Sequence, residues 1–126
     1  MKYIDAKRVR IKIGDLWESP MLNVLLSEED GVVVARCLEF TVSAHGSLEN
    51  DAIESLAEAI KEYVLTAIEN KTIHALYDPA RPKYWRAFKE IEKKKSIALL
   101  NKSINLSLKN DYFQAMNRTE PELIYV

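Results

Sequence analysis

Few residues in this chain of 126 have side chains that could act in catalysis. The only thiol is Cys37, and the only histidines are His45 and His74. A cysteine activated by a nearby histidine is a common nucleophile, so Cys37 with His45 is the pair to consider. Cys37 ends an apolar run, however, where a buried and inert cysteine is the commoner case. The chain also lacks a Gly-x-Ser-x-Gly motif, a phosphate loop and a His-x-x-x-His pair, so the sequence predicts that it is not an enzyme.

Three carboxylates, Asp30, Glu39 and Asp51, could together hold a metal ion in the manner of a nuclease. They fall in expected turns or at the start of a helix, where acidic residues are usually solvated surface groups. Cys37 has no second ligand at zinc-binding spacing. We therefore expect neither a metal ion nor another cofactor.

Charge is divided unevenly along the chain, although the net charge is only −1. Eight acidic residues stand between Glu28 and Glu58 against one basic residue, Arg36. Between Arg81 and Lys102, eight basic residues stand against two acidic ones. This segregation indicates two surfaces with different partners, or an electrostatic contact of one half with the other half or with a second subunit. Two merely solvated surfaces are the alternative.

Length and composition indicate one domain with a core, because 48% of the residues are hydrophobic. No apolar run approaches the roughly 18 to 20 residues that a membrane span needs. The first ten residues, MKYIDAKRVR, lack the apolar segment of a secretory signal. We expect a cytoplasmic protein that makes no contact with a membrane.

The apolar pattern of the first half predicts antiparallel strands. Residues 6–14 alternate apolar and basic side chains, which is typical of a half-buried strand. Apolar runs at 21–26 and 32–37, joined by a turn that contains Asp30 and Gly31, predict a hairpin. Residues 40–44 add a short strand that ends before Gly46.

A long helix is expected after Gly46, because apolar residues recur at steps of three and four from Ile53 to Ile68. Its opposite side carries the charged residues Glu54, Glu58, Lys61, Glu62 and Glu69. The apolar side predicts that this helix covers one face of the sheet.

A C-terminal extension is expected to contain a helix at about 82–94 and a strand at about 97–108. Pro82 suits the first position of a helix, and Ile104, Leu106 and Leu108 alternate with polar residues as in a strand. We interpret the aromatic residues of this helix as core rather than as a nucleic-acid surface. The predicted organisation is one α+β domain at 1–78 with an extension at 79–126 packed on it.

The segment from Met21 to Ile68 shows a recognisable order of features. A hairpin is followed by an acidic residue, a short strand ending in glycine, and a helix with an early alanine. The residues concerned are Glu39, Phe40, Val42, Gly46, Asn50, Asp51, Ala52, Leu56, Glu58, Ala59 and Ile60. This segment resembles the HicB-like antitoxin family. It departs from that family at His45, where glutamine is usual, and in lacking the Pro-Gly that often follows the acidic residue.

The resemblance implies a partial ribonuclease H-like fold, with a three-stranded antiparallel sheet, a long helix packed on it and a further strand. Family members neutralise HicA-type mRNA interferases by covering the active site of the toxin. The resemblance therefore implies a non-catalytic binding module with a small basic toxin as its partner.

The residues that we expect to contact such a partner are Glu28, Glu29, Asp30, Glu39 and His45. We also expect a homodimer formed through an exposed sheet edge or through the second helix. The alternative is a stand-alone homo-oligomeric structural or regulatory protein that keeps the fold without a toxin. A nucleic-acid-binding or nuclease remnant is a third interpretation.

Many members of the family carry a C-terminal DNA-binding segment. In this chain KSINLSLKNDYFQAM has the look of a ribbon-helix-helix start. Its ribbon residues facing DNA would be Ser103, Asn105, Ser107 and Lys109. Only ten residues follow Met116, which is too few for the second helix of that motif. An ordinary strand is thus the preferred interpretation, and nucleic acid is not an expected partner.

Overall fold

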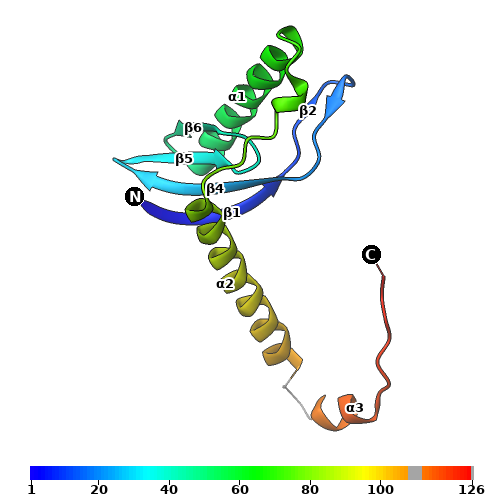
Figure 1. Ribbon diagram of the computed structural model, residues 1–126. Helices are drawn as coiled ribbons and strands as arrows, with labels where there is room; N and C mark the ends of the chain where they lie inside the picture. Colours follow the sequence, from blue (N-terminus) through cyan, green and yellow to red (C-terminus); the bar gives the residue numbers. More distant parts are fainter. Residues whose placement is uncertain (108–111, 126) are drawn as a thin grey trace. The chain divides into compact units, whose positions relative to one another are not determined.

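The computed structural model describes residues 1–107 and 112–125, with only the backbone at residues 106 and 107. Four strands form an antiparallel sheet in the order β1-β4-β5-β6 (Figure 1). Their bounds are β1 (Lys2–Val9), β4 (Leu22–Glu29), β5 (Val32–Cys37) and β6 (Val42–Gly46). The other elements are a small hairpin of β2 (Lys12–Ile13) and β3 (Trp17–Glu18), and the helices α1 (Glu49–Glu69), η1 (Ile73–Ala75), α2 (Pro82–Ser107) and α3 (Tyr112–Arg118). The predicted α+β class is confirmed.

The chain divides into two compact units, Met1–Glu92 and Lys93–Val126. The first unit contains the sheet, α1 and the start of α2. It reaches beyond residue 78, where we expected the domain to end, because the start of α2 packs on the sheet.

The hairpin formed by β4 and β5 has the predicted turn. Glu29 pairs with Val32, which leaves Asp30 and Gly31 as the two central residues. Their φ angles are 50° and 81°. Two positive φ angles define the type I′ turn, whose twist matches that of paired strands. Asp and Gly tolerate this conformation, so the local sequence specifies both the turn and the register.

The sheet has four strands and not three, because β1 pairs with β4 from Lys2 opposite Glu28 to Val9 opposite Leu22. The strand predicted at 6–14 is therefore wrong in its bounds. It begins earlier and stops at Val9, and Lys12 and Ile13 pair instead with β3. Alternation shows that a segment is half buried, but it does not show which neighbour the segment pairs with.

The helix α1 covers one face of the sheet, as its apolar side predicted. Side chains of a strand point alternately to the two faces, and every second residue of β4 faces α1. The buried residues of this core include Leu22, Val24, Leu26, Ala35, Cys37, Ala52, Leu56, Ile60 and Val64. The residues of β4 that lie between these, such as Leu25, therefore point to the second face of the sheet.

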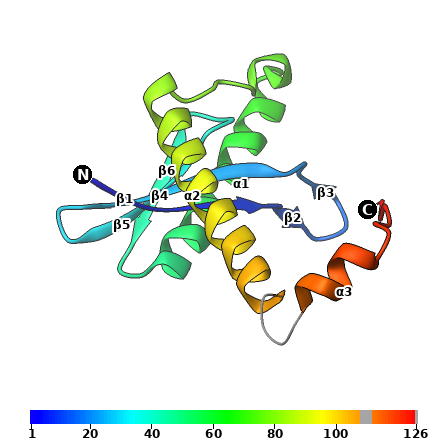
Figure 2. The ribbon, with the colours of Figure 1, turned by 90° about the horizontal axis from the view of Figure 1, so that it is seen from below.

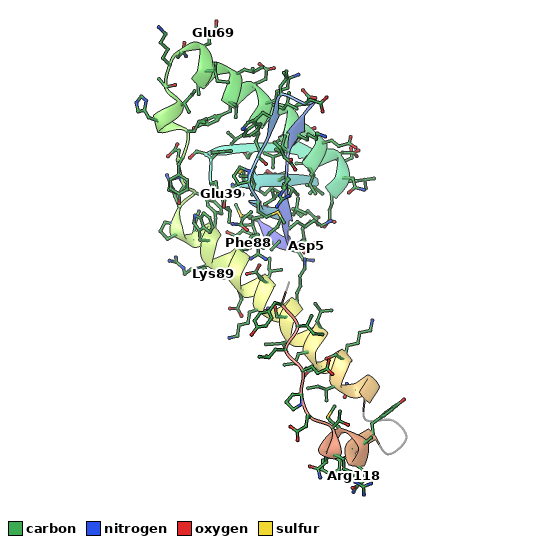
Figure 3. All side chains as sticks on the ribbon, turned by 90° about the vertical axis from the view of Figure 1, so that its right-hand side faces the viewer. Asp5, Glu39, Glu69, Phe88, Lys89 and Arg118 are labelled. Atoms are coloured by element: carbon green, nitrogen blue, oxygen red, sulfur yellow. The ribbon has the colours of Figure 1, made fainter. Side chains whose placement is uncertain are left out.

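The start of α2 covers the second face of the sheet (Figure 2). Phe88 is 3% exposed and packs in a buried cluster with Ala6, Leu25 and Leu38. Figure 3 labels Phe88 where α2 meets the strands. Arg8 lies over the Phe88 ring at 5.8 Å and forms an ion pair with Glu92. The part of α2 that belongs to the first unit is thus packed on the sheet.

The strand predicted at about 97–108 is wrong in the part that the structure describes, because residues 97–107 continue α2. Ile97, Leu100 and Ile104 recur at steps of three and four, which is the period of a helix. The strand was predicted from the alternation of Ile104, Leu106 and Leu108 with polar residues, which is a shorter pattern than the helical one. Residue 108 lies outside the described residues. The further strand that the resemblance implied after α1 is also missing from the described chain, whose last strand is β6.

The second unit, taken by itself, consists of α2 from Lys93 onward, α3, and irregular chain from residue 119 to 125. All of its described side chains are exposed. They include large apolar residues such as Leu99, Leu100 and Phe113, which are 58–69% exposed. Within the described part of the chain, no helix is long and apolar enough to cross a lipid bilayer.

Candidate protein-binding site

The outer side of α1 carries an acidic row, which we define as Asp51, Glu54, Glu58 and Glu62. All four side chains are exposed, because the apolar side of α1 is buried against the sheet. Their spacing of three or four residues places them along one side of the helix. Among the described residues, none of the four carboxylates has a cation within 4 Å. The row is therefore a continuous negative surface.

This acidic row opposes the stability of its own helix. Like charges four residues apart, such as Glu54 with Glu58 and Glu58 with Glu62, destabilise a helix by roughly 0.2–0.5 kcal/mol per pair. The nearest ion pair on α1 joins Glu49 to Lys7 at 3.9 Å, at the start of the helix. Lys61 is the only basic residue of α1. A surface that repels itself is a candidate for binding a basic partner.

The three hairpin acids proposed as partner contacts lie around the turn between β4 and β5, but they are not equivalent. Glu28 and Asp30 are exposed, whereas Glu29 is half buried. The carboxylate of Glu29 accepts a hydrogen bond of 3.0 Å from the Ser27 hydroxyl and lies 3.8 Å from a guanidinium nitrogen of Arg36. Glu29 therefore contacts its own sheet, whereas the carboxylates of Glu28 and Asp30 have no ion pair or hydrogen bond among the described residues.

Glu39 has a structural role. One oxygen of its carboxylate accepts the Asn23 backbone N–H at 2.8 Å, and the other accepts the Asn23 side-chain amide at 2.7 Å. Its backbone carbonyl accepts the Asp78 N–H at 3.0 Å. The Glu39 backbone thus contacts the segment before α2, and its side chain holds the beginning of β4. The side-chain hydrogen bonds explain an acidic residue two positions after β5 without a partner protein.

His45 lies on β6, the strand at one edge of the sheet, and its side chain is exposed. Because Val42 and Ala44 pack on the α1 side, His45 points to the face opposite α1. Glu39 and the hairpin acids lie at opposite ends of β5. The five expected contact residues are therefore spread over the first unit and do not form one cluster.

The ribbon-helix-helix interpretation fails in the described residues, because Ser103 and Asn105 lie within α2 and not on a strand. The Ser103 hydroxyl donates a hydrogen bond of 2.8 Å to the Leu100 carbonyl. Residue 107 is helical in its backbone, and Lys109 lies outside the described residues. A helix at this place cannot form the two-stranded ribbon that the motif needs.

The structure separates Cys37 from His45. Cys37 is fully buried in the core beneath α1, and His45 is exposed on the other face. Burial raises the pKa of the Cys37 thiol from 9.0 to about 11, because a thiolate loses its hydration there. A protonated and inaccessible thiol is a poor nucleophile.

We expect Cys37 to resist alkylation by iodoacetamide at pH 8 and to react at once when the protein is unfolded in urea.

The raised pKa of Cys37 also predicts how the free energy of unfolding changes with pH. The folded state keeps its proton to higher pH than the unfolded state, so this contribution is complete below pH 9.0 and is lost as the pH rises towards about 11. Mass spectrometry of alkylated protein measures the first effect and urea unfolding the second. Rapid labelling of folded protein would contradict the burial.

The three carboxylates considered as a metal site are not brought together. Asp30 and Glu39 flank opposite ends of β5, and Asp51 lies in the first turn of α1. In the described part of the chain, no group of three or more His, Cys, Asp or Glu side chains could hold a metal ion.

Comparisons of the chain with protein-family models, with curated proteins and with solved structures found no match. The sequence already showed the residues of the acidic row as the solvent side of a helix. The signal that distinguishes them is the recurrence of acids at steps of three and four residues, with Lys61 as the one basic residue among them.

Proposed function

We propose that the protein is a non-catalytic binding module, antitoxin-like, that neutralises a small basic toxin such as an mRNA interferase by covering its active site. The acidic row on α1, together with Glu28 and Asp30, provides the contact surface. Because mRNA is the target of such a toxin, the proposal includes a cytoplasmic location.

The observation that carries this proposal is the acidic row itself. Its carboxylates are exposed, have no cation within 4 Å among the described residues and repel one another along the helix. Binding of a basic surface would relieve that repulsion and would steer the partner during encounter. The resemblance of residues 21–68 to the HicB-like antitoxin family supports a toxin as the partner.

The test is the Glu58→Lys variant. A lysine here replaces two repulsive pairs, with Glu54 and with Glu62, by two attractive ones, and makes one pair, with Lys61, repulsive. We therefore expect a net gain of about 0.5 kcal/mol in the free energy of unfolding. We expect affinity for the basic partner to fall about tenfold or more, because a charge of the contact surface is reversed. Urea unfolding measures the first change, and calorimetry with the partner purified from the native cells measures the second. A variant that is more stable and yet binds less well cannot be explained by misfolding.

The matched control is Glu120→Lys, which makes the same charge change at an exposed position of the second unit. It should leave both quantities unchanged. The captured protein should also cleave RNA, and the wild-type chain should inhibit that cleavage in a stoichiometric complex. Equal binding by the wild type and by Glu58→Lys would show that the acidic row is not the contact surface.

The second candidate function, a stand-alone homo-oligomer, is favoured by a different observation. In the second unit, Ile97, Leu100 and Ile104 follow one another at the a, d, a spacing of a coiled coil, and all three are exposed. A second copy of the chain would cover this stripe. Recovery of the protein alone from its own cells, as an oligomer of defined mass, would favour this candidate over the toxin partner.

A further inference from the structure

A pocket of about 300 Å³ opens on the face of the sheet opposite α1. It lies between the end of β5, the beginning of β6 and the segment that leads into α2. Its polar lining comes from Arg36, Thr41, Ser43, Arg81 and Tyr84. The acidic row lies on the outer side of α1, so this pocket is separate from the surface proposed above.

Arg36 is the central residue of the pocket, and its side chain is only 18% exposed. The guanidinium lies over the Tyr84 ring, 4.3 Å from its centre, and one terminal nitrogen is 3.8 Å from the Glu29 carboxylate. The other terminal nitrogen, Nη1, is buried and has no hydrogen-bond partner among the described residues. A buried donor without an acceptor is costly, and native structures rarely keep one unless water or a ligand meets it.

The surroundings of this pocket are positive, in contrast to the rest of the first unit. Residues 1–92 contain sixteen acidic against twelve basic residues. At the pocket, Arg81 is exposed on its wall, and the Lys83 ammonium lies 4.9 Å from the centre of the Tyr84 ring. Glu29 is the one carboxylate that contacts Arg36 within 4 Å among the described residues. Two guanidinium groups, those of Arg36 and Arg81, thus line the pocket, and the Lys83 ammonium lies near them over the Tyr84 ring.

We propose that this pocket binds a small organic anion, in which a carboxylate or phosphate group meets Arg36 and Arg81. Guanidinium groups are suited to both, because their N–H donors match the geometry of the oxygens. Phe40, Val42 and Pro79 form apolar parts of the wall and accommodate an uncharged body. A volume of about 300 Å³ lies at the lower end of the range for ligand pockets, so the ligand is small.

The first test is titration of the ¹⁵N-labelled full-length protein with three probes, followed by NMR. Benzoate carries a carboxylate on an apolar ring, benzamide is its neutral counterpart, and inorganic phosphate is the bare oxyanion. We expect saturable shifts at Thr41, Ser43 and Tyr84 with benzoate or phosphate, and none with benzamide. Tighter binding of benzoate would assign a carboxylate ligand with an apolar body, and tighter binding of phosphate would assign a phosphate ester.

The variants Arg81→Gln and Arg86→Gln provide the second test. Both side chains are exposed and both belong to the segment around the start of α2, but only Arg81 lines the pocket. We expect Arg81→Gln to weaken anion binding about tenfold, since one charged hydrogen-bond donor is lost, and Arg86→Gln to leave it unchanged. Equal effects of the two variants, no saturable shift with either anion, or equal binding of benzamide and benzoate would each overturn the proposal.

Discussion

Replacement of Phe88 by alanine should lower the free energy of unfolding of the first unit by about 3–5 kcal/mol, the usual cost of removing a buried phenyl ring. Phe88 is 3% exposed and fills the space between Leu25, Leu38 and Ala6. No other large side chain of α2 is buried to the same degree in the described residues. The loss is a large fraction of the roughly 5–15 kcal/mol that stabilises a typical domain.

Urea unfolding of Phe88→Ala against Lys89→Ala separates burial from helix propensity. The two positions are neighbours on α2, but Lys89 is exposed, and Figure 3 labels both. Lys89→Ala should change the free energy of unfolding by less than about 0.5 kcal/mol. If Phe88→Ala were equally mild, the start of α2 would not be held on the sheet in solution.

The second large effect is expected for Gly46→Ala, at the junction between β6 and α1. A Cβ atom at this position would lie 2.6 Å from the Ala52 backbone nitrogen and 2.7 Å from the Asp51 Cβ. Backbone atoms cannot move aside as a flexible side chain can, so the strand and the helix would have to separate. We expect a loss of about 2–3 kcal/mol, at the upper part of the usual range for overpacking.

The control for Gly46→Ala is Gly14→Ala, where the cause of any loss is different. Gly14 has a φ of +51°. Apart from its two chain neighbours, no described residue has an atom within 4 Å of the place that an alanine methyl group would take, so backbone strain is what opposes alanine there. That strain costs about 1–2 kcal/mol. Circular dichroism should show a weakened α1 signal for Gly46→Ala alone. A Gly46→Ala protein as stable as the wild type would show that the close approach of β6 and α1 is not required.

Gly46 also bears on the resemblance to the HicB-like antitoxin family. The glycine that follows the short strand predicted at 40–44 is one of the features that carry this resemblance. Its tight contact with the first turn of α1 gives it a purely structural reason, and so do the hydrogen bonds of Glu39 to Asn23. Both features therefore follow from the packing of a helix on a sheet, whether or not the chain binds a toxin.

Much of the first unit could be predicted from local patterns. The hairpin at Asp30 and Gly31, the short strand before Gly46 and the long helix that follows depend on turn chemistry and apolar period, which are properties of neighbouring residues. The candidate site was only partly predictable. The acidic row was visible as a helix face, but the hydrogen bonds of Glu39 and the burial of Glu29 required the pairing of distant segments.

By itself, the sequence determined the α+β class, the turn of the hairpin and the side of α1 that is buried, because backbone geometry gives each element its own period. Only the tertiary structure decided that β1 completes the sheet, since an alternating run shows that a segment is half buried but not which strand it pairs with. It alone also brought Arg36 and Arg81 to one pocket. Contacts between residues far apart in the sequence depend on which element covers which face of the sheet. A pattern of neighbouring residues does not contain that information.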